Sequence, residues 1–123
     1  MDMVGTVKSG TYGERIAALY LSLAGYRILE TNYRSGHLEI DLIADKSDCL
    51  TFIEVKTRRS VSYGSAVESI DRRKLSRLRR AARGYLAENP PQRGYNSYRF
   101  DLVAIDLDLK NGTMLLRHLK GIV

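Results

Sequence analysis

Apolar and polar residues alternate with a period of two through residues 39–44 and again through residues 51–56. Because this period turns alternate side chains to opposite faces of an extended chain, both segments are predicted to be β-strands. The polar residues 45–49 between them are few enough to join the strands as a hairpin. We therefore expect an antiparallel pair in which Ala44 lies opposite Thr51 at the mouth of the loop.

This register decides which charged side chains meet. It places Asp41 directly opposite Glu54, and Glu39 opposite Lys56, with Cβ atoms about 5 Å apart across the strands. Two carboxylates at that range repel each other unless a cation neutralises them, and oxygen ligands suit a hard divalent ion such as Mg²⁺ or Mn²⁺. Such an ion activates water and phosphoryl groups, and the Lys56 amine can orient the water or balance the developing charge, so the pattern indicates phosphodiester hydrolysis.

A simpler interpretation of the same charges stays open. Glu39 and Lys56 can form an ordinary cross-strand ion pair, and Asp41 and Glu54 can lie on a solvated face of the sheet. The metal site is favoured because the second strand is apolar enough for the centre of a sheet, where several charges on one face are costly without a purpose.

The pattern predicts a helix on each side of this hairpin. The first covers residues 11–24, opens with the T-x-x-E spacing of a capping box at Thr11 and Glu14, and ends at Gly25. For Glu14, a capping role and a place near the metal are both open. The second helix covers residues 69–88, with an apolar stripe on one face and arginines over the rest.

Three more strands complete the predicted fold. They cover residues 26–33, 100–107 and 114–119, and a two-residue Asn111-Gly112 turn joins the last two. The order is then αβββαββ, in one α/β domain spanning residues 1–123.

Composition narrows the class of protein. The single cysteine, Cys49, excludes an intramolecular disulfide and a zinc site built from cysteines. No apolar run reaches the length of a membrane span and no signal peptide is recognisable, so we expect a cytoplasmic protein with no membrane partner.

Positive charge is concentrated in one part of the chain. Residues 57–99 contain 11 Lys or Arg and 3 Asp or Glu, whereas the whole chain contains 20 and 14. A basic segment beside an acidic strand pair is typical of a protein that binds a phosphate backbone, although a solvated helix face rich in arginine is also consistent with it. The residues expected to contact phosphates are Arg58, Arg59, Lys74 and Arg77.

An acidic residue on one strand followed by Glu-x-Lys on the next, here Asp41 and then Glu54-Val55-Lys56, resembles the motif of the PD-(D/E)xK nuclease superfamily. The resemblance extends to a set of short blocks that together look like the YraN-like family of small bacterial proteins, which is placed near Holliday-junction resolvases. These blocks are Tyr12-Gly13-Glu14, Gly25-Tyr26, Thr31-Asn32-Tyr33-Arg34, Glu39 to Ala44, Phe52 to Arg58 and Arg99-Phe100-Asp101. The resemblance implies a restriction-endonuclease-like αβββαβ core with an extra C-terminal strand, in which helices flank a mixed central sheet.

The resemblance also implies roles for single residues. Asp41 and Glu54 match the metal-binding carboxylates, Lys56 the catalytic lysine, and Glu14 the glutamate that the first helix brings to the site. Glu39 matches the glutamate of the family's Gly-Glu-Ile-Asp block and is expected as a further metal ligand.

The sequence therefore predicts a metal-dependent endonuclease that acts on DNA, with branched or single-stranded substrates favoured over a particular base sequence. The basic residues suit backbone contact, and nothing resembles a recognition-helix module. A homodimer is a further expectation, since junction-cutting relatives use paired sites. The alternative function is a nucleic-acid-binding module that keeps the nuclease fold without catalysis.

Overall fold

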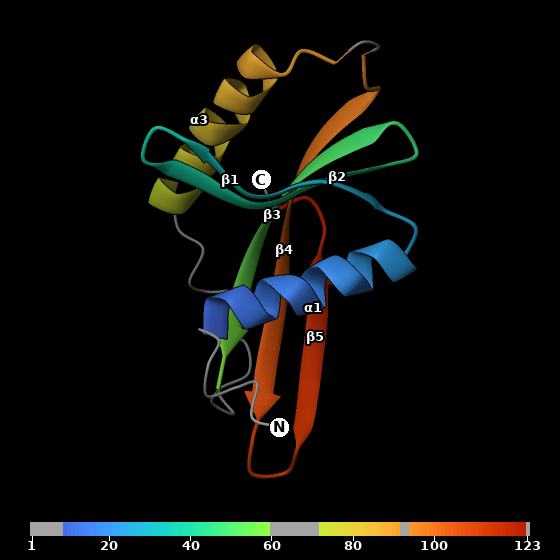
Figure 1. The fold of residues 1–123 in the computed structure, drawn as a ribbon, viewed down its shortest axis with the longest axis vertical. Coiled ribbons are helices and arrows are strands. Elements are labelled where there is room, and N and C mark those ends of the chain that lie inside the picture. Colours follow the sequence, from blue (N-terminus) through green and yellow to red (C-terminus); the bar gives the residue numbers. More distant parts are fainter. Residues whose placement is uncertain (1–8, 60–71, 92–93, 123) are drawn as a thin grey trace.

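The computed structural model describes residues 9–59, 72–91 and 94–122. Five strands form one sheet in the order β1-β2-β3-β4-β5, and two described helices pack against it (Figure 1). The elements are α1 (Ser9–Leu23), β1 (Arg27–Ser35), β2 (Leu38–Lys46), β3 (Cys49–Arg58), α3 (Arg72–Glu88), β4 (Ser97–Asp108) and β5 (Thr113–Leu119). The predicted αβββαβ core with an extra C-terminal strand is confirmed.

The sheet is mixed because β3 and β4 are parallel while the other neighbouring pairs are antiparallel. A parallel pair needs a long crossover connection, and α3 lies within it. This topology makes β3 the middle strand of the sheet, paired antiparallel with β2 through residues 49–53 and parallel with β4 along its whole length (Figure 1).

Apolar side chains form a core on both faces of the sheet. On one face, α1 packs Ala17 and Leu21 against a buried cluster that includes Ile53. On the other face, α3 packs Leu78 and Tyr85 against a second cluster from β2 and β3. The apolar stripes of the helices therefore bury both faces of the central strands, as an α/β sheet requires.

The start of α1 differs from the prediction. The described helix begins at Ser9, so Thr11 lies inside it and cannot act as the predicted N-cap. The predicted end is confirmed, because Gly25 follows the helix with φ 95°, a conformation that favours glycine. Glu14 is thereby free of the capping role that its spacing suggested.

Both predicted hairpin loops also differ. β2 and β3 are longer than predicted and turn through Ser47 and Asp48 alone, whose φ angles are 50° and 60°. The predicted two-residue turn at Asn111 and Gly112 is wrong, because β4 and β5 pair only as far as Asp108 and Thr113 and a four-residue connection lies between them. The Asp108 carboxylate accepts hydrogen bonds from the backbone and side-chain amides of Asn111, which stabilises the wider turn.

The end of β3 matters most for function. The predicted strand ends at Lys56, but β3 continues through Arg58 because it pairs with β4 along its whole length. The first residues of the predicted helix, 69–71, lie outside the described residues. Neither described helix is long and apolar enough to cross a membrane.

Candidate active site

The candidate site begins where β2 and β3 part. The predicted pair of Ala44 and Thr51 is confirmed, but the ladder ends at Leu42 and Ile53, one pair short of Asp41 and Glu54. Beyond this point the Asp41 carboxylate, rather than the β2 backbone, accepts the hydrogen bond of the Val55 amide at 2.7 Å. Asp41 is therefore anchored in the fork between the two strands.

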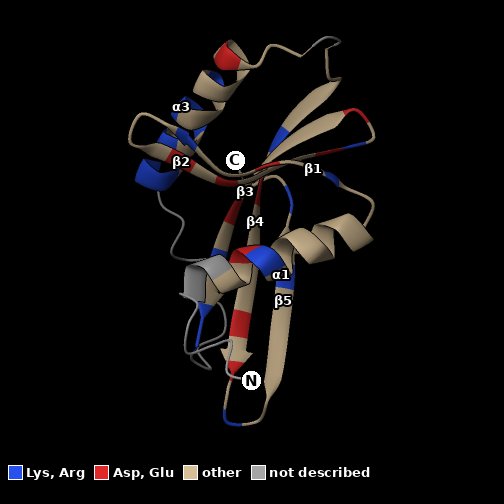
Figure 2. Cartoon of the chain, viewed as in Figure 1, with Lys and Arg blue, Asp and Glu red and all other residues tan. Residues whose placement is uncertain are grey.

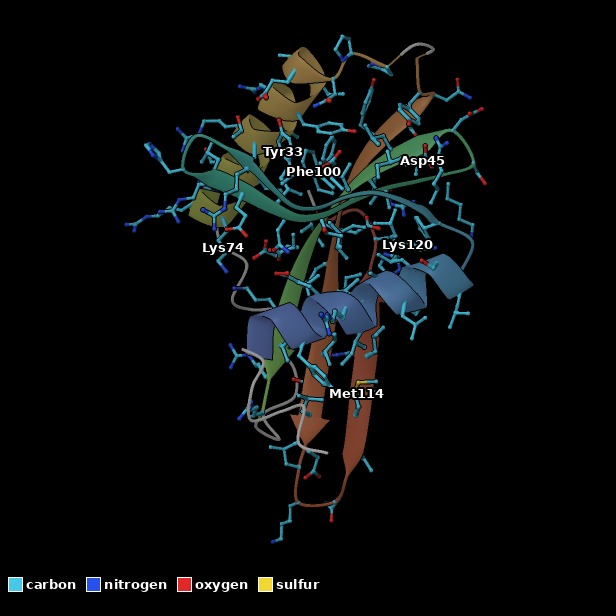
Figure 3. All side chains as sticks on the ribbon, viewed as in Figure 1. Tyr33, Asp45, Lys74, Phe100, Met114 and Lys120 are labelled. Carbon is cyan, nitrogen blue, oxygen red and sulfur yellow. The ribbon has the colours of Figure 1, made fainter. Side chains whose placement is uncertain are left out.

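Glu54 lies beside Asp41 and faces two lysines. A side-chain hydrogen bond between Asp41 and Glu54 is one of the causes that raise the pKa of Asp41. The Oε1 atom of Glu54 is 3.7 Å from the Lys56 amine and 3.5 Å from the Lys74 amine. Lys56 comes from the same strand, whereas Lys74 reaches in from α3 and is labelled in Figure 3. One oxygen of Glu54 on β3 is thus within 4 Å of the Lys74 amine on the basic helix α3.

Helix α1 brings Glu14 towards the same carboxylates. Burial raises the pKa of Glu14, a hydrogen bond with Asn32 opposes this, and the negative charges of Glu39 and Glu54 raise it further. The approach is close because Gly13 has no side chain: a Cβ atom there would collide with the Thr57 hydroxyl on β3. The absence of a side chain at Gly13 therefore lets α1 lie close enough to β3 for the charge of Glu14 to raise the pKa of Asp41.

Burial is the largest influence on the pKa values of Asp41 and Lys56, and neighbouring charged groups add to it. Burial raises the pKa of Asp41 to about 8, and Glu54 and Glu14 add to the rise, while the hydrogen bond from Val55 opposes it. Burial and the neighbouring Lys74 lower the pKa of Lys56. Burial and the negative charges of Glu54 and Glu14 thus disfavour the ionised form of Asp41, and a bound cation would favour it.

A cleft of about 220 Å³ opens over these residues. It is lined by residues of β2, β3, α3 and the adjoining turns, among them Glu39, Asp41 and Glu54. Glu39 is exposed, and the prediction that it lies opposite Lys56 is wrong because β2 has already left β3 at that point. Among the described residues, no three His, Cys, Asp or Glu side chains are close enough together to hold a metal ion. The structure thus brings Asp41 and Glu54 together and leaves Glu39 at the rim.

The residues predicted to contact phosphates fall into two places. Lys74 and Arg77 line the cleft itself, from the first half of α3. Arg58 is half-buried at the end of β3, and Arg59 is exposed directly after it. Figure 2 shows Lys and Arg concentrated along α3 beside the acidic positions of the strands.

A second group of polar residues is centred on β4. The Arg99 guanidinium and the Asp101 carboxylate form an ion pair, with Nε 2.8 Å from Oδ1. The carboxylate of Asp101 also accepts a hydrogen bond from His118 Nε2 at 2.7 Å, and the Tyr20 hydroxyl lies 2.9 Å from His118 Nδ1. Asp101 and His118 are 17 residues apart in the chain, and Tyr20 and His118 are 98 apart, so no local sequence pattern could have revealed these two contacts.

Comparison with known proteins places the chain in a family. The model of the Uncharacterised protein family UPF0102 matches residues 13–105, which include Glu14, Asp41, Glu54 and Lys56. A UPF0102 protein of Chloroherpeton thalassium is 46% identical over 102 residues, covering 83% of this chain and 78% of that protein. A UPF0102 protein of Moorella thermoacetica is 44% identical over 116 residues, covering 93% of each chain. A third, of Kineococcus radiotolerans, is 43% identical over 115 residues, covering 92% and 91%. The resemblance to the YraN-like family is confirmed, and the chain belongs to the uncharacterised protein family UPF0102.

Proposed function

We propose that this protein is a metal-dependent endonuclease that hydrolyses DNA phosphodiester bonds and selects DNA by structure rather than by base sequence. The observation that supports this most is the pair of adjacent carboxylates, Asp41 and Glu54, held at the fork of two strands with two lysine amines within 4 Å of Glu54. Metal-assisted phosphoryl chemistry uses this combination of oxygen ligands and nearby cations.

The residues present fit a magnesium-type ion. Mg²⁺ commonly binds through one or two carboxylates and completes its shell with water and substrate phosphates. Asp41 and Glu54 supply such a pair, and the charge of Glu14 adds to the field at Asp41. A site with so few protein ligands is one in which the substrate itself is expected to contribute oxygens.

Each group of the site has a distinct role in this proposal. Mg²⁺ or Mn²⁺, when bound, supplies polarisation of a phosphoryl oxygen and acidification of a water. The Val55 amide fixes the orientation of Asp41, and Lys56 offers a positive charge next to Glu54 where negative charge develops on the phosphate. Before DNA binds, the Lys74 amine neutralises the charge of Glu54. When a substrate phosphate enters the cleft, the Lys74 amine binds that phosphate instead.

The basic helix supplies the substrate-binding surface. Helix α3 carries seven Lys or Arg in the segment RRKLSRLRRAARGYLAE, and one acidic residue. Its buried residues face the sheet, so most of its arginines are exposed to solvent. Backbone contacts of this kind attract any nucleic acid by counterion release and discriminate by shape. Branched and single-stranded DNA are the favoured substrates.

A second function is favoured by one observation. Glu54 already has two lysine neighbours, and the described residues contain no group of three metal-ligating side chains. A protein that binds nucleic acid without cutting it would need no more than this. The alternative is therefore a non-catalytic binding module with the nuclease fold.

Cleavage of labelled single-stranded, duplex, flap and four-way-junction DNA in Mg²⁺ or Mn²⁺ separates the two functions. We expect metal-stimulated cleavage that falls by at least about tenfold, roughly 1.4 kcal/mol of barrier, in both Asp41→Asn and Lys56→Ala. Mn²⁺ binding, measured by calorimetry, should be weakened in Asp41→Asn but kept in Lys56→Ala, because only the first removes a proposed ligand. Glu30→Gln, which alters an exposed carboxylate on β1, is the matched control and should change neither quantity.

DNA affinity in metal-free buffer tests the binding surface separately. Replacing Arg58, Arg59, Lys74 and Arg77 together should flatten the dependence of affinity on salt, since fewer counterions are released. Binding of all four DNAs with no metal-stimulated cleavage of any would make the binding module the better description.

A further inference from the structure

A second hollow, of about 370 Å³, lies beyond the C-terminal end of α1. Residues from the α1–β1 connection, the β2–β3 turn, the start of β4 and the end of β5 line it. It shares no lining residue with the cleft over Asp41 and Glu54. Figure 3 shows the separation, with Lys74 of the cleft near the first turn of α3 and Lys120 of the hollow near the C-terminal half of α1.

The lining is cationic and aromatic. Lys46, Arg99 and Lys120 provide three positive charges, and Tyr26 and Tyr98 provide two phenol rings. No Asp or Glu is among the described residues that line the hollow. A concave surface with this composition suits an anionic group attached to something flat and apolar.

Arg99 is held rigidly at this surface. Its guanidinium donates to both oxygens of Asp101, at 2.8 and 2.9 Å, and to the Tyr26 hydroxyl at 2.7 Å. The Asp101 side chain is fully buried, whereas 28% of the Arg99 side chain is exposed. These bonds use the Nε and Nη2 donors of Arg99, so its Nη1 donors, held in a fixed orientation, are those that can bind a phosphate oxygen.

At the buried end of this network, both oxygens of the Asp101 carboxylate accept hydrogen bonds. Besides Arg99, Asp101 accepts hydrogen bonds from His118 Nε2 at 2.7 Å and from the Gly121 amide at 3.0 Å. Burying an ion pair in a sheet is seldom more stabilising than apolar packing would be. A further consequence here is that Arg99 has one orientation at the hollow.

Two lysines complete the positive surface. The Lys46 amine donates to the Ala24 carbonyl at 2.6 Å and lies 5.3 Å from the centre of the Tyr26 ring. Lys120 is exposed and makes no hydrogen bond or ion pair with any described residue. None of the described residues that line the hollow has a carboxylate that would neutralise these two lysines.

We propose that this hollow is a second binding site, for the terminal phosphate of a nucleotide, either free or at the end of a nucleic-acid strand. Arg99, Lys46 and Lys120 bind the phosphate, and the exposed ring of Tyr98, which lies 6.2 Å from that of Tyr95, supports the base. The site does not rest on the proposed nuclease activity, because it uses none of the residues of the cleft.

Calorimetric titration of the full chain in metal-free buffer tests the site. The probes are thymidine 5′-monophosphate, thymidine, and one oligonucleotide with and without a 5′-phosphate. We expect the phosphate to improve binding at least tenfold, about 1.4 kcal/mol, and this gain to disappear in Lys120→Ala. The control is Lys110→Ala, which alters an exposed lysine of the β4–β5 connection and should keep the gain.

Each result of these titrations either supports the proposed phosphate site or overturns it. Thymidine binding as tightly as its monophosphate, or an unchanged gain in Lys120→Ala, would overturn the site. A larger gain for the oligonucleotide than for the mononucleotide identifies a strand end as the ligand, and the reverse identifies a free nucleotide. Because Cys49 also lines the hollow and is the single cysteine of the chain, slower alkylation of its thiol in the presence of the monophosphate is a second measure. The gain should persist in Asp41→Asn, so failure of this site and failure of the nuclease proposal are distinguishable.

Discussion

Asp41 and Asp101 lie on strands of the same sheet and have opposite surroundings. Asp101 is fully buried, and although burial alone would raise its pKa, hydrogen bonds from His118, Arg99 and Gly121 lower it. Asp41 is only partly buried and has one backbone donor, and burial and neighbouring carboxylates raise its pKa to about 8.

These surroundings distinguish a structural carboxylate from one whose charge is available to bind a ligand. The partners of Asp101 all come from the protein, so its charge is compensated as soon as the chain folds. Asp41 and its neighbour Glu54 have fewer compensating groups and open into a cleft. Burial alone does not separate the two kinds of site; the balance of donors against like charges does.

The largest expected effect is on the compensated carboxylate. Asp101→Ala leaves Arg99 and His118 without their shared partner inside the protein, so the free energy of unfolding should fall by about 3–5 kcal/mol. Urea denaturation measures this, with Glu30→Ala as a surface control that should stay within about 0.5 kcal/mol of the wild type. A loss for Asp101→Ala as small as that of the control would contradict the assignment of Asp101 as structural.

The pH dependence of stability should follow from the same residue. The pKa of Asp101 is lower in the folded state than in the unfolded chain, where it is about 3.9. Its stabilising contribution is therefore fully present above that value and is lost as the pH falls towards the folded-state pKa. Unfolding free energies measured between roughly pH 5 and pH 2 should fall less steeply in Asp101→Asn than in the wild type. Equal slopes would mean that the carboxylate is not stabilised by its partners.

The smallest expected effect is on the crowded carboxylate. Asp41→Asn keeps an oxygen that can accept the Val55 hydrogen bond and removes the buried ionisable group beside Glu54, so stability should stay equal or rise by up to about 1 kcal/mol. Thermal unfolding without added metal measures this change. A marked drop in melting temperature would show that Asp41, like Asp101, serves the fold.

Much of the fold was predictable from local pattern. Strand and helix periods gave the element order, and the short polar segment between residues 44 and 51 was enough to predict the pair of Ala44 and Thr51. The proximity of Asp41 and Glu54 followed from that register, although the predicted place of Lys56 opposite Glu39 did not. These features depend on neighbours in sequence, and a sequence contains that information directly.

Other features were decided by the tertiary structure. The strands part after Leu42 and Ile53, which moves Glu39 to the rim, and α3 brings Lys74 to Glu54. Pairing with β4 along its full length extends β3 through Arg58, although that segment looks like a loop. Sequence alternation shows that a residue belongs to a strand, but where two strands separate depends on the twist of the whole sheet and on the helices packed against it. For the same reason the contacts of His118 with Asp101 and with Tyr20 could not be predicted from the sequence: they form only when α1, β4 and β5 are packed together.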